Sequence, residues 1–200
     1  MYEGLGEFVV QFELIVFSMR EALTLLWSRG GPPKFQQLVR PGLAELTADP
    51  MVRIFQASFA EAVKTSGASE AEKSMGNKIL AAICNRMRKL IKARNEIVHG
   101  TWFIGYAAPE DIDFSVADGH KAINNKYGVE HRDISRTRQD FDALSDECNE
   151  VNDLINRFFS TVLFGRSVCA NFVCDGKDGI TLESHLWTFR RRSANADQPS

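Results

Sequence analysis

The sequence predicts a mainly α-helical protein: an antiparallel four-helix-type bundle with a small β-hairpin excursion between the third and fourth long helices. Two observations carry this prediction. Long stretches place apolar residues three and four positions apart, which is the period of an amphipathic helix. Residues 101–135 lose this period and are rich in aromatic residues, Gly and Asp. A chain of 200 residues with a hydrophobic fraction of 44% is large enough for one domain with a sizeable core.

The first predicted helix covers residues 4–27 and ends at a run of Gly and Pro over residues 29–33. Its apolar stripe should face the core. The stripe consists of Leu5, Phe8, Val9, Phe12, Val16, Met19, Leu23 and Leu26. Glutamates interrupt the apolar start of the chain, so we expect no signal peptide. No window approaches the ~20 apolar residues that cross a bilayer, and we expect a cytoplasmic protein without a membrane partner.

A second helical region follows at residues 34–64. Pro41-Gly42 and Asp49-Pro50 are expected to break it. The pattern therefore predicts a short helix that ends near Leu46 and a fuller one that starts at Met51.

The third helix has the clearest boundaries, because Ser69 and Glu72 have the spacing of a capping box and Gly100 is a natural stop. His99 is its expected last residue. The helix is basic although the net charge of the chain is −2. Its cations are Lys73, Lys78, Arg86, Arg88, Lys89, Lys92 and Arg94.

The excursion should contain short strands at residues 102–106 and 112–116, with Asp118-Gly119 as a turn. A fourth helix is predicted from Thr137, with Asp140 as capping partner, to Phe164. Its polar face is acidic. This face could attract the basic third helix, or the two helices could present opposite charges to different partners. The acidic residues are Asp142, Asp146, Glu147, Glu150 and Asp153.

We divide the chain into a helical bundle at residues 1–165, a C-terminal extension packed on it at 166–189, and a disordered tail at 190–200. In the extension, residues 168–173 should pair with 180–182. Cys84 and Cys148 fall in helical patterns and are expected to be buried small residues. Cys169 and Cys174 lack a second pair at zinc-ligand spacing, so we expect no metal site and a reduced protein.

The candidate catalytic residues are Arg94, Asn95 and His99, at the end of the basic helix. Arg94 falls on the apolar stripe, where a guanidinium costs desolvation unless it is paired or faces a cleft. Asn95 lies one turn from His99 and can orient it. Arg can hold two phosphate oxygens and His can transfer a proton near pH 7, so the pair suits phosphate chemistry. The structural alternatives are an Arg94 ion pair with the acidic fourth helix and a His99 that only caps its helix.

The stretch Arg94-Asn95-Glu96-Ile97-Val98-His99-Gly100 resembles the signature of the HEPN superfamily, an Arg and a polar residue followed by a His at the end of a bundle helix. The resemblance implies a helical homodimer, with Arg94 and His99 as catalytic pair and Asn95 as the polar position. Many such proteins are metal-independent endoribonucleases in toxin–antitoxin or antiphage defence systems, and others are inactive binding modules. It also implies a cognate antitoxin or defence-system protein as partner. Thr101 stands where a subset carries the Tyr modified by a nucleotidyltransferase antitoxin, which argues against that antitoxin.

The geometry of a helix also favours a dimer. Five residues rise about 7.5 Å and rotate by about 140°, so Arg94 and His99 of one copy are not expected to point the same way. A two-fold axis near the helix end would gather two of each around one cleft.

We therefore expect cleavage of RNA by attack of the 2′-hydroxyl, with no cofactor and no metal. Lys89 and Lys92 would hold the RNA backbone, and Trp102 and Tyr106 would stack on bases. For each of these four residues, a solvated face or a core hairpin is the structural alternative. The rival function is an inactive HEPN-like module that binds RNA or protein. A metal-dependent hydrolase is disfavoured, because His120 and His131 lie in no ligand pattern.

Overall fold

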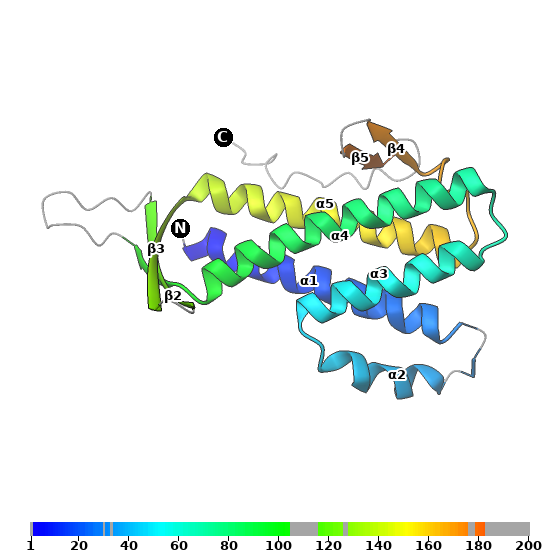
Figure 1. Cartoon of the computed structure of the whole chain (residues 1–200), viewed down its shortest axis with the longest axis horizontal. Coiled ribbons are helices and arrows are strands. Elements are labelled where there is room, and N and C mark those ends of the chain that lie inside the picture. Colours follow the sequence, from blue (N-terminus) through cyan, green and yellow to red (C-terminus); the bar gives the residue numbers. More distant parts are fainter. Residues whose placement is uncertain are drawn as a thin grey trace, which may run out of the picture.

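The computed structural model describes residues 2–29, 31–32, 34–104, 116–125, 128–175 and 179–182. Within these ranges the chain is mainly α, with five helices and a three-stranded antiparallel sheet between the fourth and fifth (Figure 1). The helices are α1 (Tyr2–Trp27), α2 (Phe35–Ala44), α3 (Ala48–Thr65), α4 (Glu70–Val98) and α5 (Arg138–Leu163). The strands are β1 (Thr101–Ile104), β2 (Val116–Asn125), β3 (Gly128–Thr137), β4 (Phe172–Asp175) and β5 (Gly179–Leu182).

The four long helices, α1, α3, α4 and α5, pack against one another and share one hydrophobic core (Figure 1). The predicted stripe of α1 is confirmed: Phe8, Phe12, Val16, Met19 and Leu23 have at most 5% of their surface exposed. Its other members, Leu5, Val9 and Leu26, are partly buried against the same core. Cys84 and Cys148 are buried as expected, and burial raises the pKa of both thiols to about 12. No helix in the described ranges is long and apolar enough to cross a membrane.

The second helical region forms the predicted short helix and fuller helix, α2 and α3, but they separate at residues 45–47, and neither Pro41-Gly42 nor Asp49-Pro50 breaks a helix. Pro41 lies inside α2, and Pro50 lies in the first turn of α3, where its missing N–H has no helical partner to lose. In α2 the ring removes a single backbone bond. The buried side chain of Leu43, and the Nε of Arg20 that donates to the Leu43 carbonyl at 3.1 Å, hold the end of this short helix against α1.

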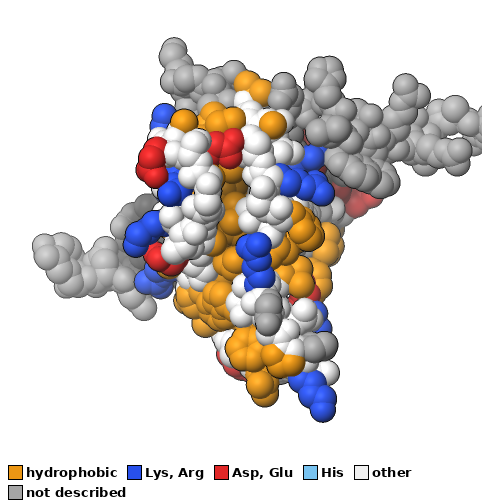
Figure 2. Space-filling model, turned by 90° about the vertical axis from the view of Figure 1, so that its right-hand side faces the viewer, with side chains coloured by type: hydrophobic (Ala, Val, Ile, Leu, Met, Phe, Trp, Pro, Cys, Tyr) orange, Lys and Arg blue, Asp and Glu red, His pale blue; other side chains and the backbone are white. Residues whose placement is uncertain are grey.

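Helix α2 covers the C-terminal half of α1, where Arg40 pairs with Glu21. It leaves two large apolar side chains exposed, Phe35 at 39% and Leu38 at 75%. Figure 2 views the molecule from the right-hand side of Figure 1. It shows hydrophobic side chains over the lower part of this face, at the height of α2.

Helix α4 begins as predicted, because the Ser69 hydroxyl accepts a hydrogen bond from the Glu72 N–H. It ends at Val98, with His99 as its C-terminal cap and Gly100 next. A Cβ on Gly100 would lie 2.9 Å from the Glu96 carbonyl oxygen, so this position needs a glycine for lack of space.

The predicted turn at Asp118-Gly119 is wrong, since both residues lie inside β2 and pair with β3. The sheet order is β1-β2-β3, with Trp102 opposite Gly119. A Cβ on Gly119 would approach three atoms of the Trp102 ring to 3.0 Å. The glycine therefore accommodates an indole and does not make a turn. The predicted strand at 102–106 is confirmed in part by β1, and most of 112–116 lies outside the described residues.

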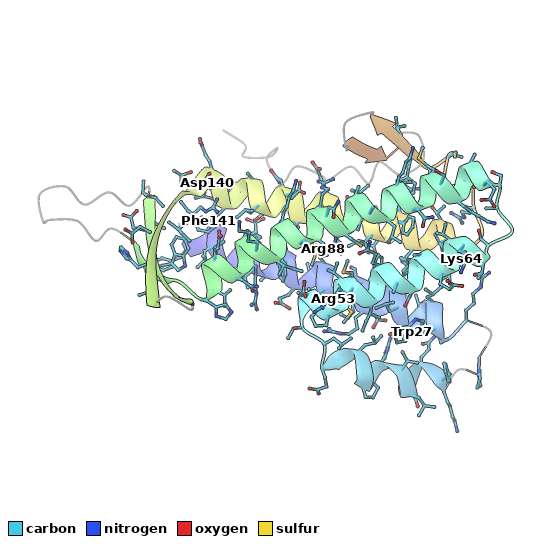
Figure 3. All side chains as sticks on the ribbon, viewed as in Figure 1. Trp27, Arg53, Lys64, Arg88, Asp140 and Phe141 are labelled. Atoms are coloured by element: carbon cyan, nitrogen blue, oxygen red, sulfur yellow. The ribbon has the colours of Figure 1, made fainter. Side chains whose placement is uncertain are left out.

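Helix α5 is bounded by two local motifs. Thr137 and Asp140 form the predicted capping box, and Asp140 and Phe141 stand at the start of the helix beside the sheet (Figure 3). At its other end Gly165 has a φ of 62°, with its N–H bonded to Val162 and the N–H of Arg166 bonded to Thr161. This pattern is a Schellman motif, which satisfies the last carbonyls.

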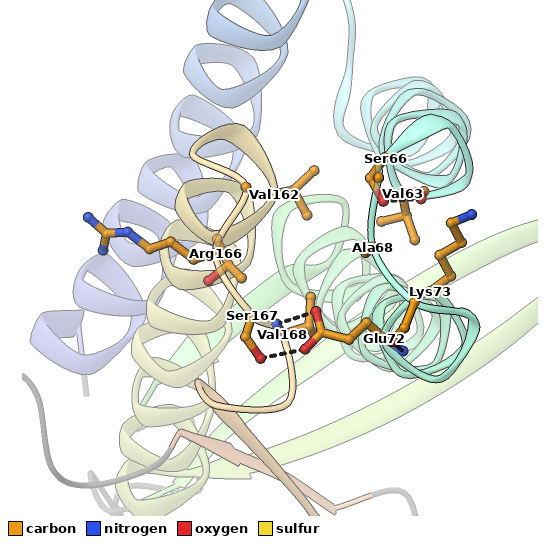
Figure 4. A pocket seen from close by; sticks show the side chains of 13 residues that line it. Val63, Ser66, Ala68, Glu72, Lys73, Val162, Arg166, Ser167 and Val168 are labelled. Carbon is orange, nitrogen blue, oxygen red and sulfur yellow. Dashed lines mark hydrogen bonds between the residues drawn. The ribbon is translucent and has the colours of Figure 1, made fainter.

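After α5 the chain returns along α4 and α5. Strands β4 and β5 pair antiparallel, which confirms in part the pairing predicted for the extension: the first strand begins at Phe172 and not at residue 168. Phe172 is 2% exposed and packs edge-on against Phe158 of α5. The Glu72 carboxylate accepts hydrogen bonds from the Ser167 hydroxyl and from the Val168 N–H at 3.2 Å (Figure 4). The tail predicted at 190–200 lies outside the described residues.

Candidate active site

Arg94, Asn95 and His99 line one pocket between α1, the start of α3 and the end of α4. Its volume is about 380 Å³. The wall from α1 contains Phe12, Glu13, Val16 and Arg20, and the α3 side contributes Leu46, Thr47, Ala48 and Asp49. The three predicted catalytic residues therefore meet within a single copy. The geometry of a regular helix predicts that Arg94 and His99 point apart, but His99 is the cap residue after the last helical residue, and both residues line this pocket.

Arg94 has weak polar contacts for a half-buried guanidinium. Its Nη2 lies 3.6 Å from Glu13 Oε1, and its Nη1 donates to Asn95 Oδ1 at 3.4 Å. Its Nε is buried without a hydrogen-bond partner, and the guanidinium carbon lies 5.9 Å from the centre of the Phe12 ring. The carboxylate beside Arg94 thus belongs to α1 and not, as the structural alternative assumed, to the acidic α5.

Arg86, on the same helix, shows what a structural arginine looks like here. It donates through Nε and Nη2 to both oxygens of Glu147 at 2.6 Å, and through Nη2 to Glu150 at 2.7 Å. The hydrogen bonds with Glu147 raise the pKa of the Arg86 guanidinium. At Arg86, therefore, α4 and α5 attract each other as one of the two alternatives predicted. Because Arg86 has this fork-to-fork pairing and Arg94 does not, Arg94 retains donor capacity for a ligand.

His99 is exposed, and as the cap of α4 its N–H donates to the Asn95 carbonyl at 3.3 Å. His99 lines the pocket together with two arginines, Arg20 and Arg94. Imidazole can give or take a proton near neutral pH, and guanidinium binds phosphate oxygens in pairs. The arrangement is therefore suited to bind a phosphate and to move a proton next to it.

Arg20 is the site residue that the sequence analysis missed. It lies between Val16 and Leu23 on the apolar stripe of α1, and a charge in such a stripe is the same signal that pointed to Arg94. Helix α3 begins at the pocket after Thr47, so the partial positive charge of its first turn adds to the two arginines. Glu13 and Asp49 are the acidic groups of the lining.

The residues proposed to bind RNA are placed differently from one another. Lys89 and Lys92 are exposed on α4. Trp102 is half-buried: its indole N–H donates to the Ile97 carbonyl at 2.6 Å and its ring packs edge-on against Phe141 at 6.2 Å. These contacts favour the structural alternative for Trp102, which joins the sheet to α4 and α5. Tyr106 lies outside the described residues.

No cluster of three potential metal ligands occurs in the described part of the chain. His120 lies on β2 and contacts Asp133 of β3 at 2.5 Å, which explains this histidine as part of the sheet's polar face. Comparison of the chain with protein-family models, curated proteins and solved structures finds no match.

Proposed function

We propose that this protein is a HEPN-like, metal-independent endoribonuclease that acts as a homodimer. The observation that carries the proposal is the pocket in which Arg94, Asn95 and His99 meet while the Arg94 guanidinium lacks close partners. A four-helix arrangement with the motif at the end of a helix is the setting in which HEPN proteins keep their Arg and His.

The reaction follows from the roles these groups can take. One His99 removes the proton from the ribose 2′-hydroxyl, whose oxygen attacks the adjacent phosphorus. The bond from phosphorus to the 5′-oxygen breaks, and a second His99 protonates that oxygen. Arg94 stabilises the charge on the phosphorane, and Asn95 orients His99. The products are a 2′,3′-cyclic phosphate and a 5′-hydroxyl.

Two histidines at one site require two copies of the chain, and the surface of α1 supports such pairing. Val10, Leu14 and Phe17 are between 45% and 59% exposed and form one stripe that α2 leaves uncovered. The stripe borders Glu13 and therefore the pocket. Residues 2–19 of α1 contain glutamates but no Lys or Arg.

The second candidate is an inactive HEPN-like module that binds RNA or a protein partner. The contact of Arg94 with Glu13 and Phe12 favours it, because an arginine used only for packing would also be held between helices. The two functions differ in turnover. In a toxin–antitoxin or antiphage role, the active enzyme would act on host or invader RNA and require a neutralising partner.

The experiment incubates purified protein with single-stranded RNA in EDTA and identifies the new ends. The nuclease proposal expects fragments with 2′,3′-cyclic phosphate and 5′-hydroxyl ends. Bound but intact RNA after hours supports the binding module. Induction of the chain in a host gives a second readout, since the nuclease should arrest growth and its Arg94→Ala variant should not.

A further inference from the structure

Arg20 of α1 and Arg94 of α4 line the same pocket from two different helices. The Arg20 Nε donates to the Leu43 carbonyl at 3.1 Å, which fixes the plane of its guanidinium through a single bond at Nε. Two cations that share a pocket of about 380 Å³ repel each other unless an anion lies between or beside them.

The two carboxylates of the lining differ in how strongly they are held. Asp49 pairs with Arg53 on its own helix at 2.8 Å. Glu13 approaches Arg94 through one oxygen at 3.6 Å, and its side chain is 56% exposed. Of the two, Glu13 is therefore the one that partly neutralises Arg94 and can swing into solvent without leaving a close hydrogen bond behind.

We propose that Arg20 and Arg94 together hold one phosphodiester of single-stranded RNA in this pocket, and that Glu13 occupies Arg94 when RNA is absent. The inference rests on the proposed function for its choice of ligand. A phosphate group offers oxygens to both guanidinium groups, and such charge-assisted bonds are stronger than an exposed ion pair made through one oxygen. RNA thus replaces Glu13 at small cost, and Glu13 keeps the empty pocket from binding weaker anions.

The test measures binding separately from cleavage. A fluorescein-labelled 2′-O-methyl oligoribonucleotide, which lacks the attacking hydroxyl, is titrated with the full chain, and Kd is followed by anisotropy over a range of salt concentrations. Arg20→Gln is the first variant, because its amide can still donate to the Leu43 carbonyl while the charge is gone. Glu13→Gln is the second. Matched controls are Arg40→Gln, an exposed arginine of α2, and Glu7→Gln, an exposed glutamate of α1.

We expect Arg20→Gln to weaken binding about tenfold and to lower the slope of log K against log salt by about one. Glu13→Gln should tighten binding several-fold, and both controls should bind as the unchanged chain does. The inference is overturned if the unchanged chain does not bind the probe, if Arg20→Gln binds normally, or if Glu13→Gln weakens binding.

The result separates this inference from the proposed nuclease activity. Altered binding by Arg20→Gln and Glu13→Gln without any cleavage of ordinary RNA leaves the phosphate site standing and removes the enzyme. Cleavage in EDTA with unaltered binding in both variants keeps the enzyme and removes the role of Arg20. A melting curve of each variant shows that the fold is retained.

Discussion

Arg94 Nη2 lies 3.6 Å from Glu13 Oε1, whereas Arg86, on the same helix, donates to Glu147 at 2.6 Å through two nitrogens. The first contact joins α4 to α1 loosely beside a pocket, and the second fastens α4 to α5. One helix therefore carries an arginine that stabilises the fold and an arginine that is available to a ligand.

Truncation of Arg86 should mainly lower the stability of the fold, whereas truncation of Arg94 should mainly lower RNA cleavage. Arg86→Ala should lower the free energy of unfolding by about 2 kcal/mol, because it leaves Glu147 and Glu150 without their donor. Arg94→Ala should change it by less than about 1 kcal/mol, since it removes a long ion pair, yet abolish RNA cleavage. Urea denaturation followed by circular dichroism and a cleavage assay measure the two effects. A large loss of stability in Arg94→Ala with unchanged cleavage would show that Arg94 is a packing residue.

The exposed stripe of α1 gives a prediction about assembly. Leu14→Glu should weaken self-association at least about tenfold, because it places a charge in the apolar centre between Val10 and Phe17. Leu38→Glu on α2 is the control, since this leucine is even more exposed and lies away from the stripe. Analytical ultracentrifugation measures both. If Leu14→Glu remains as dimeric as the control, the two copies do not meet at this stripe.

Gly119 and Trp102 provide a prediction about the sheet. Gly119→Ala should lower the free energy of unfolding by about 1–3 kcal/mol, because the added methyl would press on the Trp102 ring. Gly6→Ala on α1 should instead raise the free energy of unfolding. Nothing lies within 4 Å of the Cβ position of Gly6, and Ala is the better helix former. Thermal unfolding of the two variants gives the comparison. Equal stability for Gly119→Ala and the unchanged chain would mean that the indole does not lie on this glycine.

The attachment of the C-terminal extension should depend on pH through Glu72. The hydrogen bond from the Ser167 hydroxyl holds the pKa of this carboxyl below its usual value of 4.5. The ionised group therefore stabilises the fold above about pH 4.5, and this stabilisation is lost as the pH falls through the lower folded value.

Glu72→Gln should remove this acid-dependent part of the stability, and hydrogen exchange at the Val168 amide should become faster at neutral pH. Glu70→Gln is the matched control, since Glu70 is 90% exposed and pairs with Lys73 at the surface. Both variants are compared with the unchanged chain in melting curves at pH 7 and pH 3.5. Identical acid sensitivity in the unchanged chain and Glu72→Gln would contradict the role of Glu72.

The parts of the fold that sequence predicts well are those decided by near neighbours. The Thr137–Asp140 box, the Ser69 cap and the stripe of α1 depend on spacing along one helix, and all are present. Asp118-Gly119 was misassigned because its glycine is required by an indole on another strand. Glu72 was expected to complete its own cap, but its carboxylate contacts a segment from the far end of the chain.

The candidate site shows the same division. Arg94 and His99 are predicted from their neighbours on one helix. Arg20 carries the same local signal, but only the packing of α1 beside α4 places it and Glu13 in one pocket with Arg94. Trp102 was chosen for its aromatic ring, and no local pattern shows that this ring is used by Ile97 and Phe141. Arg20 and Arg94 share one sequence signal: each is a charged residue inside the apolar stripe of its helix.

The rate of RNA cleavage by His99→Ala in EDTA is the most direct measurement of the proposed activity, with His120→Ala as a control histidine on the sheet. If His99 transfers the proton, its variant should cleave at least about 100-fold more slowly under single-turnover conditions, while His120→Ala should keep the rate of the unchanged chain. Cleavage by His99→Ala at the rate of the unchanged chain would contradict the assignment of the active site to the end of α4.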